Sequence, residues 1–132
     1  ALDAYIDDHI TGYALLHSTT ALLGFLQGGM MALHVGLRRN PALAAIVSFS
    51  GALVGADKIE KTAVAKPSVL LVHGMMDTVV PYAAMPASSH YLEAAGLQVQ
   101  TETRPMLGHS IDQEGLAKAG IFLSKYLGKV VA

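Results

Sequence analysis

Cysteine is absent from this 132-residue chain, and tryptophan is absent as well. Without cysteine the protein has no disulfide, no thiolate nucleophile and no cysteine-ligated metal site, while its redox compartment stays undetermined. The histidines do not suggest a metal centre either, because His9, His17 and His90 show no ligand spacing with a carboxylate or with one another. We therefore expect no metal and no other cofactor.

Charged residues are also scarce. They make up 14% of the chain, and the formal net charge is -1 at pH 7. Arg38 and Arg39 form an adjacent basic pair, which is too small to serve as a nucleic-acid-binding patch. We therefore expect no nucleic-acid partner.

No stretch of the sequence is apolar enough to predict a membrane span. The longest apolar run, residues 21–37, is broken by small or polar residues: Gly24, Gln27, Gly28, Gly29 and His34. The chain begins at Ala1 and has early aspartates where a signal peptide would have a basic n-region. We expect a soluble, cytoplasmic protein with no membrane span, whose natural N-terminus has been partly removed or left out.

Apolar residues, by contrast, are abundant. They make up 52% of the chain, and the mean hydropathy is +0.44, which is high for a soluble domain of this size. A small domain has much surface to cover with polar groups, so this composition indicates missing partner elements or self-association. We expect residues 1–132 to form a single, partial domain.

Hydrophobic patterning predicts strands that alternate with helices. The β-prone, largely apolar runs predict buried strands at residues 19–25, 44–49 and 68–73, and alternation predicts a partly exposed strand at residues 97–104. Helical periodicity predicts helices at residues 2–10, 30–39, 82–95 and 112–127, with a polar surface connection at residues 57–66 and a loop at residues 74–81. This alternation is typical of a parallel α/β sheet with short connections.

The first predicted strand leads into a glycine-rich turn, residues 24–29 (GFLQGG). In the serine-hydrolase motif G-x-S-x-G, two glycines allow a tight turn and a close approach of strand and helix, which holds the central side chain above the sheet. Gly24 and Gly28 occupy the glycine positions, and Leu26 occupies that of the serine. A leucine held in this conformation costs about 1–3 kcal/mol without supplying a hydroxyl, which indicates a lost function.

Other interpretations of this turn were weighed against the hydrolase motif. A P-loop requires lysine followed by serine or threonine after its last glycine, and a dinucleotide-binding turn requires G-x-G-x-x-G. Residues 27–29 (QGG) match neither pattern. Taken alone, the six residues are equally compatible with a structural glycine turn that never had a chemical role.

Two further polar residues follow predicted strands. Asp77 lies in the loop after residues 68–73, and His109 lies in the loop after residues 97–104. Active-site residues of parallel α/β sheets lie beyond the carboxyl ends of the strands. Singly, each residue is compatible with a capping or surface role, but the order nucleophile position, aspartate, histidine is that of the α/β-hydrolase triad. Together they favour a catalytic interpretation.

The remaining polar and sulfur-containing residues near these strand ends receive weaker assignments. His73 ends a predicted strand, and we expect it to bond the backbone. Met75 and Met76 adjoin Asp77 and could line an apolar acyl pocket. Three serines lie outside any glycine-flanked strand-to-helix turn and are poor replacements for the nucleophile: Ser48, Ser50 and Ser110.

Four sequence segments follow one another along the chain: GFLQGGMMALHVGLRR, SFSG, LLVHGMMDTVVP and LGHSI. Together they closely resemble the phospholipase/carboxylesterase branch of the α/β-hydrolases, which includes acyl-protein thioesterase-like enzymes. The resemblance covers nearly the whole chain. It implies a parallel-sheet α/β-hydrolase fold, truncated to about the four C-terminal strands with flanking helices, because family members carry about four additional strands before Leu2.

The resemblance also implies roles for individual residues. Leu26 stands where the family has its nucleophilic serine, Asp77 corresponds to the triad acid and His109 to the base. The backbone N–H of Gln27 corresponds to one oxyanion donor, and nothing in this sequence matches the second. The implied substrate is a small acyl ester or thioester.

Two functions follow as hypotheses. The first is a carboxylesterase or acyl thioesterase that uses a serine triad, inactive or strongly impaired here because Leu26 replaces the serine. The second is a non-catalytic module that binds an acyl ligand or another protein. Its basis is the first strand, residues 19–25, which has no predecessor to pair with and leaves an open sheet edge. We expect homo-oligomers to form through this edge.

Overall fold

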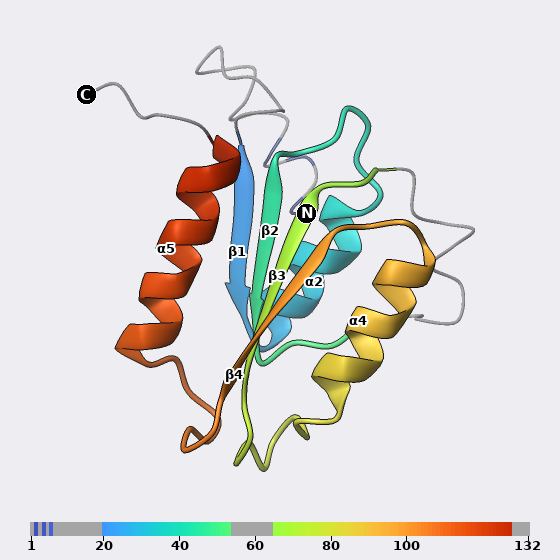
Figure 1. Cartoon of the computed structure of the whole chain (residues 1–132). Helices are drawn as coiled ribbons and strands as arrows, with labels where there is room; N and C mark the ends of the chain where they lie inside the picture. The colour runs from blue at the N-terminus through green and yellow to red at the C-terminus, as the bar shows by residue number, and fades with distance from the viewer. Residues whose placement is uncertain (1, 3, 5, 7–19, 54–64, 128–132) are drawn as a thin grey trace.

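The computed structural model describes residues 2, 4, 6, 20–53 and 65–127. Its centre is a four-stranded parallel sheet in the order β1-β2-β3-β4, so each strand lies beside its neighbour in the sequence. The strands are β1 (Ala21–Phe25), β2 (Ala45–Phe49), β3 (Ser68–Gly74) and β4 (Val99–Arg104). All four arrowheads in Figure 1 point to the same edge of the sheet, which collects the carboxyl ends of the strands.

Helices cover both faces of the sheet. The helices α2 (Gln27–Gly36) and α4 (Ala84–Ala94) lie on one face, and α5 (Gln113–Leu127) lies on the other (Figure 1). Coverage of both faces explains why β2 is buried at every position. The predicted α/β fold, a parallel four-stranded sheet with flanking helices, is therefore confirmed.

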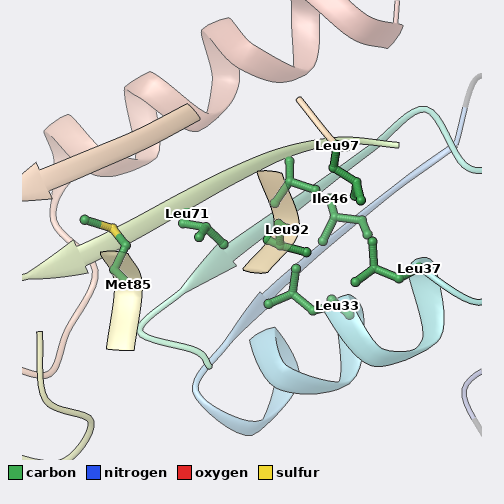
Figure 2. Close-up of a cluster of buried hydrophobic side chains, with 9 residues drawn as sticks. Leu33, Leu37, Ile46, Leu71, Met85, Leu92 and Leu97 are labelled. Carbon is green, nitrogen blue, oxygen red and sulfur yellow. The ribbon is translucent and has the colours of Figure 1, made fainter. Parts of the chain in front are cut away.

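One core fills the space between the sheet and the pair α2 and α4. Its leucines, isoleucine and methionine converge from both helices and from the central strands (Figure 2). Leu33, Leu37, Ile46 and Leu92 are 0–1% exposed. Fully burying such a side chain contributes about 1.5–3 kcal/mol, so these contacts hold α2 against the sheet directly behind the turn at Leu26.

A second core lies on the opposite face. Val47 and Phe49 of β2 and Leu70 and Val72 of β3 pack there against α5, whose contributions include Phe122. The two cores use alternate residues of the same strands, as expected for a pleated strand buried on both faces. This arrangement makes β2 and β3 the best-covered scaffold for the loops at their carboxyl ends.

Several predicted boundaries differ from the structure. The helix predicted at residues 30–39 begins at Gln27 and ends at Gly36, because the chain becomes helical immediately after Leu26 and closes with a tight Arg38 N–H to Val35 C=O bond. The other strands and helices shift by one or two residues at their ends. The predicted helix at residues 2–10 falls mainly outside the described residues, although Leu2, Ala4 and Ile6 are helical.

Most of the connection predicted at residues 57–66 also lies outside the described residues, and at its end Ala65 is buried rather than exposed. Across the part of the chain that the structure describes, no helix is both long enough and apolar enough to cross a membrane.

Candidate active site

The turn between β1 and α2 holds Leu26 in an unusual backbone conformation, with φ 55° and ψ -115°. A positive φ is uncommon for a residue other than glycine and costs about 1–3 kcal/mol. Backbone hydrogen bonds hold the conformation in place. The Leu26 N–H donates to Phe49 C=O at 2.9 Å, and the Met30 N–H donates to Leu26 C=O at 3.0 Å. The turn thus has the strained geometry of a hydrolase nucleophile elbow, with an alkyl side chain at its centre.

Two glycines permit the strand and helix to approach each other, but they are not the pair that the motif predicts. A Cβ on Gly24 would lie 2.2 Å from the carbonyl carbon and oxygen of Gly28, and one on Gly29 would lie 2.5 Å from Ser48 Oγ. A Cβ on Gly28 would meet nothing within 4 Å. Gly28 is therefore not needed for close packing, and the prediction for this glycine is wrong, because it occupies the exposed side of α2.

Asp77 lies in a tight turn just after β3. Its Oδ1 accepts hydrogen bonds from the backbone N–H groups of Val79 and Val80, each at 2.9 Å. The residue is 7% exposed and its carboxylate is fully covered. The turn predicted at residues 74–81 therefore fixes an ionisable group inside the protein rather than at its surface.

His109 reaches Asp77 from the loop that follows β4. Its Nδ1 lies 3.0 Å from Asp77 Oδ2 and 3.1 Å from Oδ1. An ionised carboxylate only accepts hydrogen bonds, so Nδ1 carries the proton and donates it to Asp77. In the neutral ring Nε2 is then left as an acceptor. The two residues, 32 positions apart in the sequence, form a hydrogen-bonded carboxylate–imidazole pair, and their roles as triad acid and base stay a prediction.

Gly74 explains why the two loops lie so close together. A Cβ at this position would meet the carbonyl oxygen of Leu107 at 2.2 Å and that of Gly108 at 2.5 Å. The Met76 N–H also donates to Leu107 C=O at 3.0 Å, which ties the two loops directly to each other. The sequence motif around Gly74 therefore has a packing role in addition to its role in the turn.

Opposing effects set the pKa of Asp77. Burial raises it, but the hydrogen bonds from His109 and from the backbone of Val80 and Val79 outweigh burial and lower the pKa from 3.8 to about 2. The hydroxyl of Ser50 contributes to the lowering. The carboxylate is consequently ionised throughout the physiological range, as a group that orients and stabilises an imidazolium must be.

This lowered pKa predicts a dependence of stability on pH. Because the folded-state pKa lies below the unfolded value, the ionised Asp77 contributes stability above pH 4 that is lost as the pH falls through about 2. The free energy of unfolding of the parent protein and of Asp77→Asn is measured by urea denaturation at each pH. The difference between the two proteins should decrease by about 2 kcal/mol between pH 5 and pH 2, to the disadvantage of the parent. Asparagine retains the acceptor for Val79 and Val80, and parallel pH profiles of the two proteins would contradict this assignment.

The turn at Leu26 adjoins the acid–base pair. The ring of Phe25, the residue before Leu26, lies 5.0 Å from that of His109, centroid to centroid. Gln27 is the first residue of α2, where the backbone N–H has no acceptor within the helix. The carboxyl edge of the sheet therefore brings together the loops that contain Leu26, Gln27, Asp77 and His109.

Neighbouring residues divide into interior and surface positions. His73 is buried, and its Nε2–H donates to Val80 C=O at 2.8 Å, which confirms the predicted backbone bond. The same Nε2 lies 3.5 Å from Asp77 Oδ2, a proximity that the sequence did not predict.

Met75 and Met76 are 51% and 60% exposed, so they present apolar surface beside Asp77 rather than enclosing a pocket. A hollow of about 460 Å³ lies elsewhere, between α4 and β4.

Comparisons with known proteins identify the family of this chain. Residues 1–127 match the model of the phospholipase/carboxylesterase family. The chain belongs to this family. It is 35% identical over 109 residues to acyl-protein thioesterase 1 of Gibberella zeae, covering 79% of this chain and 46% of that protein. It is 32% identical over 100 residues to esterase YpfH of Escherichia coli, covering 75% of this chain and 41% of that protein.

Solved structures of the family show the same fold. The crystal structure of esterase PE8 superposes with a TM-score of 0.92 at 40% sequence identity, covering 96% of this chain and 59% of that chain. The chain thus spans less than half the length of these two sequence relatives and about three-fifths of the solved esterase. The predicted membership of the phospholipase/carboxylesterase family is confirmed.

Proposed function

We propose that this chain contains most of the catalytic residues of a carboxylic-ester or thioester hydrolase of the serine type, with the nucleophile replaced by Leu26. The observation that carries the proposal is a strained, non-glycine elbow residue beside a buried Asp77–His109 pair. A fold that maintains about 1–3 kcal/mol of strain at one residue is typical of a functional turn. The names of the esterase and thioesterase relatives support the same reaction class.

The proposed chemistry follows from the orientation of His109. With Nδ1–H held by Asp77, the free Nε2 would accept the proton of a hydroxyl at position 26 as that hydroxyl attacks the acyl carbon. The Gln27 N–H would stabilise the oxyanion. Leu26 has no oxygen to attack with and no proton to give. We infer that the chain is inactive or strongly impaired as a hydrolase, although its acid–base pair is preserved.

A fluorophosphonate probe tests the proposal on the protein as it exists. The probe phosphonylates activated serine hydroxyls, so the parent chain should remain unlabelled in intact-mass measurements, because Ser48 and Ser50 are buried and the described residues that directly follow them, up to residue 53, are not helical. The variant Leu26→Ser should gain one phosphonyl group. Stoichiometric labelling of the parent would refute the inactive assignment.

A second candidate function is a non-catalytic binding module. Its support is β1, which ends the described sheet and has Leu23 49% exposed. Pairing of this edge with a second copy would give homo-oligomers. A strictly monomeric species in light scattering at high protein concentration would count against this function.

A further inference from the structure

Ser50 is a strained residue at the end of β2 that the triad does not use. Its φ is 51°, and Leu26 is the only other non-glycine residue with positive φ among those the structure describes. The Ser50 N–H donates to Val72 C=O at 2.9 Å, so the strained backbone is anchored to β3. Glycine would adopt this φ without cost. The presence of serine therefore indicates a use for its hydroxyl.

The hydroxyl of Ser50 is buried next to the acid. The residue is 1% exposed, and within the described part of the chain its Oγ has no hydrogen-bond partner. A buried, unpaired hydroxyl costs about 1–3 kcal/mol. The register pairs Phe49 with Val72, which places Ser50 beside His73, four residues before Asp77. His73 Nε2 lies 3.5 Å from Asp77 Oδ2, so Ser50, beside His73 on the neighbouring strand, adjoins the residues that surround the carboxylate.

The two oxygens of Asp77 are unequally satisfied. Oδ1 accepts from Val79, from Val80 and from His109. Oδ2 accepts from His109 and has His73 Nε2 at the longer distance of 3.5 Å. An ionised carboxylate has about four acceptor sites, so Oδ2 retains capacity for one more donor.

We propose that Ser50 is a positioning residue for Asp77: its hydroxyl donates to Asp77 Oδ2 and holds the carboxylate plane in line with His109 Nδ1. With the backbone donors fixed on Oδ1, a donor on Oδ2 prevents the carboxylate from rotating about its Cβ–Cγ bond. Both oxygens then remain about 3 Å from Nδ1, as observed. The strain at Ser50 is the cost of placing a hydroxyl where glycine would fit more easily.

Ser50→Gly separates this role from a purely structural one. Glycine relieves the backbone strain and removes the hydroxyl, so the variant should be folded and at least as stable as the parent at pH 7. The pKa of Asp77, followed by carbon NMR of its carboxyl group in the full chain, should nevertheless rise by about 0.5–1 unit, because one stabilising donor is lost. The titratable side chains that face Asp77 in the described structure, His73 and His109, remain unchanged.

Ser48, two residues before Ser50, provides a matched control. Ser48 lies in the same strand, is 2% exposed and also has an unpartnered hydroxyl, but that hydroxyl packs against Gly29 and Gly51 instead of the acid. Ser48→Ala should leave the Asp77 pKa within about 0.2 unit of the parent value. Exchange of the His109 Nδ1 proton with water should be accelerated by Ser50→Gly alone.

The two experiments distinguish a failure of the Ser50 role from a failure of the proposed hydrolase function. The inference rests on the proposed function for its catalytic meaning, but the carboxyl titration needs no substrate. An Asp77 pKa that stays at the parent value in Ser50→Gly, or that shifts equally in Ser48→Ala, would overturn the role of Ser50. Failure of Leu26→Ser to react with the fluorophosphonate probe would instead count against the proposed hydrolase function.

Discussion

Replacing Leu26 by serine should raise ester hydrolysis by about 10⁴–10⁶-fold when the chain is fused to the part of esterase PE8 that it does not cover. Asp77 and His109 are already in contact, so in the proposed mechanism the substitution supplies the missing oxygen at the strained turn residue. The measurement is kcat/KM for a short p-nitrophenyl ester. Serine also removes the isobutyl group from the space in which the acyl carbon must approach.

The same substitution in the 132-residue chain alone should give a smaller gain. Gln27 supplies a single oxyanion donor, and loss of the other costs about 10²–10³ in kcat where it has been measured. Leu26→Ala is the matched control, because it removes the same bulk without adding a hydroxyl. Equal rates for the alanine and serine variants in the fusion would contradict the assignment of position 26 as the nucleophile position.

Adding a single methyl group at Gly24 should unfold or severely destabilise the protein, while the same change at Gly28 should not. A Cβ on Gly24 would lie 2.2 Å from the Gly28 carbonyl group, which is backbone and has no alternative rotamer to adopt. Gly24→Ala should therefore lower the free energy of unfolding by about 3 kcal/mol or more, measured by urea denaturation.

Gly28→Ala provides the control for this prediction within the same turn. The position is exposed and helical, and its new Cβ would have no atom within 4 Å. Alanine is the better helix former by up to about 1 kcal/mol, so this variant should match or exceed the parent in stability. Similar losses in both variants would show that the turn needs flexible glycines rather than space at Gly24.

Most secondary structure was predictable because the responsible interactions are local. The apolar runs of β2 and β3 and the breaks at Pro67 and Gly96 mark the elements to within one or two residues. The start of α2 was not predictable in this way. Gly28 and Gly29 are poor helix formers, yet they are helical in the structure, where the Gly29 backbone lies close to Ser48 of β2.

The candidate site was predictable in its members but not in its contacts. Asp77 and His109 could be selected because each follows a strand and their order matches a known triad. Their 3.0 Å contact depends on Gly74, whose missing side chain admits the backbone of Leu107. No local pattern shows that Ser50 has a positive φ and a buried hydroxyl.

The sequence by itself determined the family, the alternation of strands and helices, and the absence of a hydroxyl at position 26, since residue identity and short-range preferences suffice for each. Only the tertiary structure decided that Leu26 adopts the strained elbow conformation, that Gly24 and Gly29 rather than Gly28 permit close packing, and that Asp77 is ionised in the interior. These properties depend on how closely backbones distant in the sequence approach one another, which local preferences do not specify.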